Sequence, residues 1–218
     1  MTGQDQTAKF ATLRSRAAWA VLLVVTALGL ASDLVSKSVA FERIADRPVV
    51  VDREQVLRAQ REGRSLGSLV PPASITVVPN VLDLSLVLNP GAVFGIGAGK
   101  RWFFVGFTAA ALGLALWMFA AWTRPRDYAA HAAIGLLVSG GLGNLYDRIL
   151  YGCVRDFLHP LPGINMPFGL NMPLTGQREI WPYVSNGADL WLLIGIVSGT
   201  FSSIFIASPV LMWIEHKW

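Results

Sequence analysis

The sequence predicts a mainly α, polytopic membrane protein with four transmembrane helices and a small extramembrane β-sheet between the first two helices. Apolar residues make up 53% of the 218 residues, and the mean hydropathy is +0.49. Charged residues account for 15%, whereas ordinary soluble domains carry about 25%. Long apolar segments also recur along the chain, so we expect a single integral membrane domain over residues 1–218.

The first transmembrane helix is predicted at 17–41. Lys9, Arg14 and Arg16 precede it, which places the N-terminus in the cytoplasm by the positive-inside rule. Its apolar start resembles a cleavable signal peptide, but the helical pattern continues for ~25 residues, enough to cross a bilayer. We therefore expect the segment to be retained.

Residues 42–99 are expected to form a periplasmic insert and β region. Its charged first part contains a short helix that begins at Asp52 and ends at Gly63. Two strands follow at Ser74–Val78 and Val81–Leu88, where β-branched residues and alternating leucines are joined by a proline–asparagine turn.

The other transmembrane helices are predicted at 102–122, 128–146 and 188–213. Tryptophans bracket the second helix, as interfacial anchors do. The third has a small residue every four positions, which favours close helix packing. The proline-rich stretch 158–182 reads as a periplasmic loop. Four spans place both termini in the cytoplasm.

Asp156 and Asp189 lie at the periplasmic edge of this predicted membrane domain. Ionisable groups in such places are costly and indicate a functional site. Two neighbouring carboxylates share a proton, which suits peptide hydrolysis, because one activates water while the other polarises the scissile carbonyl. On spacing alone, a small membrane transporter or proton relay that uses the paired aspartates is equally compatible. A non-catalytic scaffold is a third reading.

Other classes of site find little support. Cys153 is the one cysteine and cannot form an intrachain disulfide, and the histidines at 131, 159 and 216 form no metal-ligand pattern. No basic patch is interleaved with aromatic residues, so we expect no nucleic-acid partner. We expect no metal and no cofactor.

Five motifs, in order along nearly the whole chain, resemble those of the lipoprotein signal peptidases, the signal peptidase II family. They are Asp33-x-x-x-Lys37, Asn89-x-Gly-Ala-x-Phe-Gly95, Gly140-Gly-x-Gly-Asn144-x-x-Asp147-Arg148, Gly152-x-Val-x-Asp156-Phe157 and Asn186-x-Ala-Asp189. The insert at 42–72 and the loop at 158–182 are longer than this resemblance leads us to expect.

The resemblance implies an aspartic endopeptidase with Asp156 and Asp189 as its catalytic pair. It implies substrate-binding roles for Asn89, Gly91, Asn144, Arg148 and Asn186, and supporting roles for Asp33, Lys37 and Asp147. Arg148 would hold a substrate carbonyl or pair with Asp147.

The implied substrates are diacylglyceryl-modified prolipoproteins, cleaved before the lipid-modified cysteine. The implied location is the bacterial inner (cytoplasmic) membrane, with a multi-pass chain whose active site faces the periplasm. Membrane lipids are the other expected partners, and we expect a monomer.

Overall fold

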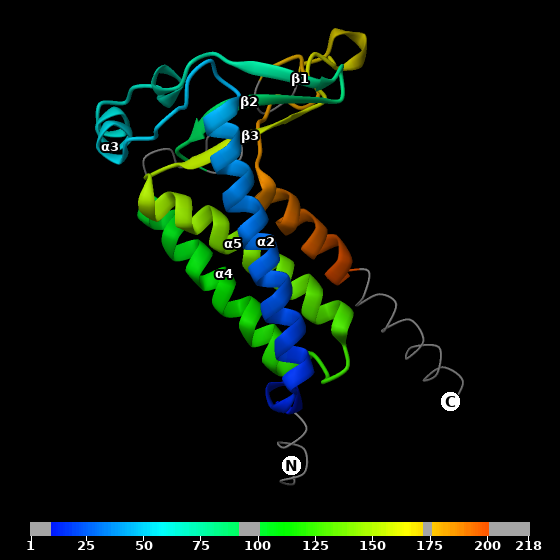
Figure 1. Cartoon of the computed structure of the whole chain (residues 1–218). Helices are drawn as coiled ribbons and strands as arrows, with labels where there is room; N and C mark the ends of the chain where they lie inside the picture. The colour runs from blue at the N-terminus through cyan, green and yellow to red at the C-terminus, as the bar shows by residue number, and fades with distance from the viewer. Residues whose placement is uncertain (1–9, 92–100, 172–175, 201–218) are drawn as a thin grey trace. The chain divides into compact units, whose positions relative to one another are not determined.

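The computed structural model describes residues 10–91, 101–171 and 176–200, in two compact units (Figure 1). Unit 1 contains Met1–Ala31, Ala109–Leu142 and Ala188–Trp218, and unit 2 contains Ser32–Thr108 and Gly143–Gly187. Residues 92–99 of the predicted insert and 201–213 of the fourth predicted span lie outside the described residues.

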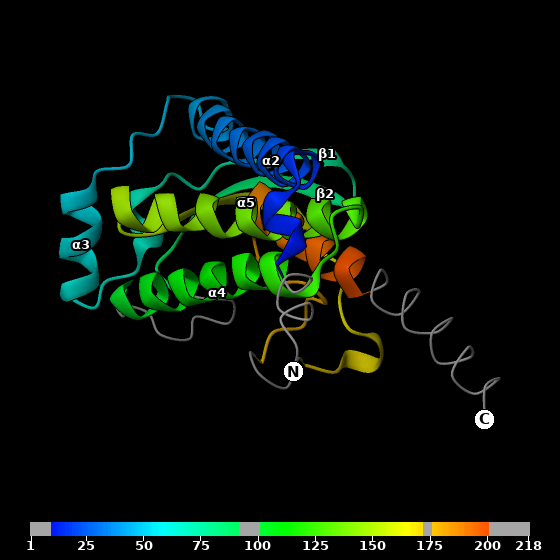
Figure 2. The ribbon, with the colours of Figure 1, turned by 90° about the horizontal axis from the view of Figure 1, so that it is seen from below.

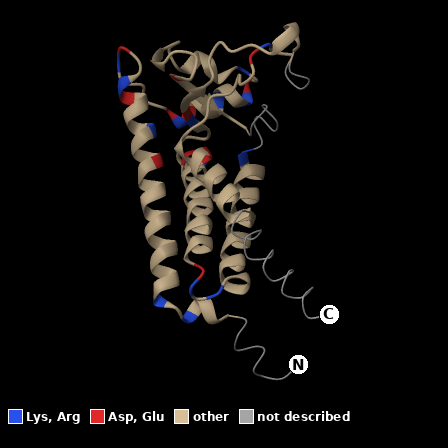
Figure 3. Cartoon of the chain, turned by 90° about the vertical axis from the view of Figure 1, so that its right-hand side faces the viewer, with Lys and Arg blue, Asp and Glu red and all other residues tan. Residues whose placement is uncertain are grey.

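The described chain contains several long helices. They are α2 (Arg16–Arg43), α4 (Arg101–Trp122) and α5 (Tyr128–Leu150), with a further helix at Gly187–Thr200 and a short 3-10 turn, η1, at Ala11–Arg14. Figure 3 shows that the helix ribbons are largely free of charged residues, which gather on the loops and sheet segments and at helix ends.

Within the described ranges, two helices are long and apolar enough to cross a membrane, namely α2 and α4. They match the predicted spans 17–41 and 102–122. The prediction at 128–146 falls within α5, which carries more polar residues, and the described helix Gly187–Thr200 is shorter. Membrane crossing by these two segments stays a prediction.

Unit 1 is held together by a core between helices. The described part of its core comprises Ala18, Leu22, Ala115, Phe119, Ile134 and Val138. Gly135, one of the predicted small residues, lets α2 approach α5, because an added Cβ would lie 3.0 Å from the Leu22 carbonyl oxygen. Figure 2 shows α4 and α5 running side by side.

Unit 2 contains an antiparallel three-stranded sheet in the order β1-β2-β3. Strands β1 (Ser74–Val78) and β2 (Leu82–Asn89) confirm the predicted hairpin, and β3 is Val154–Pro160. The prediction lacked β3 and wrongly began a loop at 158. The sheet therefore combines a hairpin that precedes α4 with a strand that follows α5.

The insert before the hairpin folds against this sheet. Helix α3 (Arg53–Arg61) begins after Asp52, whose side chain accepts a hydrogen bond from the Glu54 amide, as predicted. Gly63 has a φ of 66°, the left-handed conformation that ends many helices. Short 3-10 turns follow at η2 (Leu66–Leu69) and, in the long loop, η4 (Pro167–Gly169).

The hairpin turn offers a test of backbone conformation. Asn80 has a φ of 59°, which asparagine and glycine tolerate and β-branched residues do not. We expect Asn80→Val to destabilise the chain by about 1–2 kcal/mol, and Asn80→Gly to leave its stability unchanged or raise it. Thermal unfolding in detergent measures both, and equal melting temperatures for Asn80→Val and wild type would contradict the assigned turn.

Candidate active site

The position of Asp156 follows from the register of the sheet. Asp156 on β3 pairs with Val87 on β2, and Asn89 lies two residues beyond Val87 on the same face. Diagonal neighbours of this kind are within reach of polar side chains. Phe157 on the alternate face of β3, and Cys153 just before the strand, pack in the core of unit 2.

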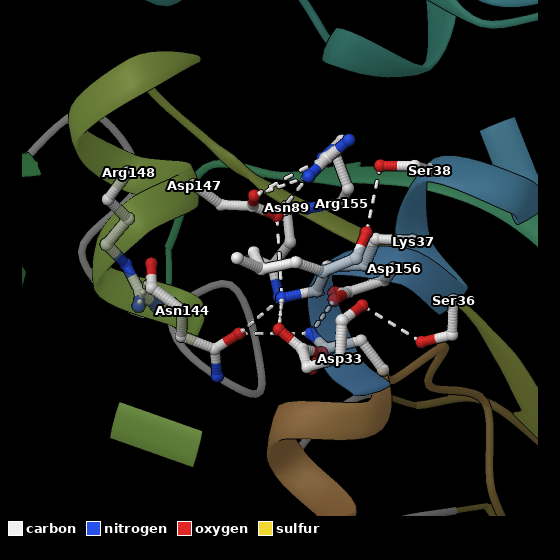
Figure 4. Close-up of polar contacts among 12 residues, drawn as sticks. Asp33, Ser36, Lys37, Ser38, Asn89, Asn144, Asp147, Arg148, Arg155 and Asp156 are labelled. Carbon is white, nitrogen blue, oxygen red and sulfur yellow. Dashed lines mark hydrogen bonds and ion pairs between the residues drawn. The ribbon is translucent and has the colours of Figure 1, made fainter. Parts of the chain in front are cut away.

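The Asp156 carboxylate is buried, with 1% of the residue exposed, and it accepts hydrogen bonds from two neutral amides. Asn89 Nδ2 donates to Oδ2 at 3.1 Å, and Asn186 Nδ2 donates to Oδ1 at 2.5 Å (Figure 4). Neutral donors hold both oxygens in place while adding no full charge beside them.

Each amide is oriented by a further contact. The Gly91 backbone N–H donates to Asn89 Oδ1 at 3.0 Å, which leaves the Asn89 amino group to face Asp156. Asn186 Nδ2 also donates to Asn144 Oδ1 at 3.2 Å. Because an asparagine amide has one donor end and one acceptor end, these contacts decide which end meets the carboxylate.

Lys37 determines the direction of this chain of amides. Its ammonium group donates to Asn144 Oδ1 at 3.2 Å and to Asp33 Oδ2 at 2.8 Å, and it lies 3.5 Å from Asp147 Oδ2. Since lysine only donates, Asn144 must present its oxygen, and Asn186 must then present its amino group. Lys37, Asp33 and Asp147 are all buried, and their supporting role stays a prediction.

Asp147 joins the end of α5 to the start of β3. Its carboxylate accepts hydrogen bonds from the Arg155 backbone N–H at 3.0 Å and from Arg155 Nη2 at 2.9 Å. The Arg155 guanidinium also lies 4.4 Å from the centre of the Tyr151 ring. The sequence analysis missed Arg155, which it treated as a variable position beside Asp156, although a buried acid in the preceding helix calls for a cation nearby.

Arg148 contacts backbone carbonyls. Its guanidinium donates to the carbonyl oxygens of Asn144 at 3.3 Å and Gly91 at 3.2 Å, and it lies 5.3 Å from the centre of the Phe104 ring. Asp147, the other partner predicted for Arg148, pairs with Arg155 and Lys37. Binding of a substrate carbonyl by Arg148 stays a prediction.

Asp189 lies in unit 1, in the first turn of the helix Gly187–Thr200, three residues after Asn186. The chain leaves unit 2 at Gly187, where a side chain would press on Asp33, since an added Cβ would lie 3.2 Å from Asp33 Oδ1. Glycine at this position allows the close approach.

Cys153 lies close to the carboxylates in sequence but is a poor nucleophile. Burial, together with the charges of Asp147 and Asp156, raises the pKa of its thiol to about 12. The reactive thiolate is therefore disfavoured at neutral pH. Among the residues that the structure describes, no group of three or more His, Cys, Asp or Glu side chains could hold a metal ion.

The sequence matches the model of a peptidase family. The family model described as signal peptidase (SPase) II matches residues 25–205, and the chain belongs to this family.

Curated relatives carry the name lipoprotein signal peptidase. The protein of Desulfitobacterium hafniense is 34% identical over 131 residues, which cover 60% of this chain and 74% of that protein. The protein of Pelotomaculum thermopropionicum is 42% identical over 129 residues, covering 59% and 68%.

Solved structures of bacterial membrane enzymes share the fold. One, determined by the in meso method, is 27% identical with a TM-score of 0.51 and covers 85% of this chain and 90% of its own. A second has a TM-score of 0.55 at 24% identity, with coverage of 86% and 90%. The mainly helical fold with a small sheet is thereby placed among membrane enzymes.

The buried ion pairs of Asp147 predict a large cost for their loss. Asp147→Asn leaves the Lys37 and Arg155 charges buried with less compensation, so we expect a loss of about 3–5 kcal/mol in the free energy of unfolding. The control is Glu62→Gln, whose pair with Arg64 is about half exposed, and we expect a loss of at most about 1 kcal/mol. Unfolding in denaturing detergent measures both variants, and equal effects would contradict the role assigned to Asp147.

The raised pKa of Cys153 predicts a slow reaction with alkylating reagents. Its thiol is buried and protonated at neutral pH, so we expect maleimide to label the folded chain at least about 100-fold more slowly than the denatured chain. Mass spectrometry of time points at pH 7 measures both rates. Labelling of the folded chain at the rate of the denatured chain would show that the thiol is accessible.

Proposed function

We propose that this chain removes the signal peptide from diacylglyceryl-modified prolipoproteins, cleaving before the lipid-modified cysteine, with Asp156 and Asp189 as its catalytic pair. The observation that carries the proposal is the buried Asp156 carboxylate, held by the amides of Asn89 and Asn186. Membership of the signal peptidase II family and the names of the relatives support the substrate class.

The partner role of Asp189 is supported by its place in the chain. Asn186 donates to Asp156, and three residues of chain reach at most ~11 Å, so Asp189 follows within a short distance of a residue that contacts Asp156. Its position in the first turn of a helix favours a negative charge there.

In the proposed reaction the two carboxyl groups share one proton. The ionised carboxylate accepts a proton from the attacking water, and the protonated carboxyl donates a hydrogen bond to the scissile carbonyl. The proton taken from the water then passes to the leaving nitrogen as the peptide C–N bond breaks. No covalent bond between the protein and the substrate is required. The amides of Asn89 and Asn186 keep the Asp156 oxygens directed while the charge moves.

The same geometry supports proposals for the remaining residues. Arg148 and the backbone of Gly91, which it contacts, would bind the substrate main chain. Asn144 lies between Lys37 and Asn186, so Lys37 orients the Asn186 amide through it. We further propose four membrane spans in the bacterial inner membrane, both termini in the cytoplasm, the site facing the periplasm and a monomeric chain. The transporter or proton-relay reading is not favoured, because the family and its named relatives are peptidases.

Isosteric substitution tests the catalytic pair. Asp156→Asn and Asp189→Asn keep the size of the side chain and remove its acid–base function, so we expect each to lower kcat at least about 100-fold. Gel-shift cleavage of a diacylglyceryl-modified prolipoprotein, with chelator present, measures the rate.

The matched control is Asp46→Asn, which changes an exposed acid in the same unit and should retain wild-type activity. Thermal unfolding establishes that each variant is folded. Wild-type activity in either Asp156→Asn or Asp189→Asn would refute the pair, and loss of wild-type activity with chelator would indicate a metal-dependent reaction.

A further inference from the structure

The insert helix α3 is packed against the rest of unit 2 although four of its nine residues are charged. Val56 and Ala59 are buried on one side of α3, in the same core as Cys153 and Phe157 of β3. Arg58 lies on the exposed side. The sequence indicated only a charged insert with a short helix, and these buried residues show that one face of α3 is part of the core.

The contact with β3 is made at the turn that precedes the strand. Gly152 has a φ of 81°, and an added Cβ there would lie 3.0 Å from Leu57 Cδ2 of α3. Gln60 Nε2 of α3 donates a hydrogen bond to the Gly152 carbonyl oxygen at 2.9 Å. Thus α3 binds both the backbone and the open side of this turn.

The turn sits between the two acids of the polar cluster. Asp147 lies in the last turn of α5, and Asp156 is the third residue of β3. The segment between them contains Gly152, so a shift of the turn would move Asp156 relative to the amides that it contacts. A hydrogen bond to the Gly152 carbonyl holds the turn at the point where helix gives way to strand.

We propose that α3 is a brace for the turn at Gly152 and Cys153, and that Gln60 is a positioning residue for Asp156. This inference rests on the proposed catalytic role of Asp156. The proposal assigns a function to the insert. Through α3, the insert holds β3, the strand that carries Asp156, and it does so without contacting the substrate.

The test compares three variants of the full-length chain. Gln60→Met removes the donor at similar length, Gln60→Lys restores an N–H donor, and Arg58→Met makes the same replacement at an exposed position of α3. We expect Gln60→Met to lower kcat about 5-fold with KM unchanged, and Gln60→Lys and Arg58→Met to stay near wild type. Cleavage of a diacylglyceryl-modified prolipoprotein at varied substrate concentration gives kcat and KM.

Three results would overturn the brace: an unchanged kcat in Gln60→Met, an effect on KM alone, or no recovery in Gln60→Lys. If the wild-type chain does not cleave the substrate, the proposed function fails, and maleimide labelling of Cys153 then decides whether α3 holds the turn. Faster labelling in Gln60→Met than in Arg58→Met supports the brace, and equal labelling overturns it.

Discussion

The buried Asp147 carboxylate is the constraint on which the rest of unit 2 depends. A buried charge must be paired and hydrogen-bonded, and Asp147 obtains both from Arg155 on β3 and Lys37 on α2. These two contacts join the end of α5 to β3, which follows it in the sequence, and to α2, which lies far from both in the sequence. They also fix the ammonium group of Lys37, from which the amides of Asn144 and Asn186 take their direction toward Asp156.

Much of this arrangement was predictable because local chemistry determines it. The α3 N-cap at Asp52, the hairpin turn at Asn80 and the helix start after Asn186 each depend on residues within a few positions of one another. The spaced motifs also nominated Asn89, Asn144 and Asn186, which the structure brings together in one hydrogen-bonded cluster with Asp156.

The features that escaped prediction depend on contacts across long sequence separations. Strand β3 contains the charged residues Arg155 and Asp156, so its pattern does not indicate a strand until β2 is available to pair with it. Arg155 is an exception, because Asp147 lies only eight residues before it; it was missed because the strand that carries it was not predicted. The charged residues of α3 did not indicate that one face of the helix is buried, because that face is formed by only two small apolar residues, Val56 and Ala59.

The central claim is that Asp156, held by two amides, acts together with Asp189 on a peptide bond. A crystal structure of the chain with an uncleavable diacylglyceryl-modified peptide would test it most directly. The account predicts that the scissile carbonyl lies within hydrogen-bond distance of one of these two carboxyl groups, with Asn89 and Asn186 still bonded to Asp156. A peptide bound away from Asp156, or an Asp189 carboxyl group directed away from the peptide, would contradict it.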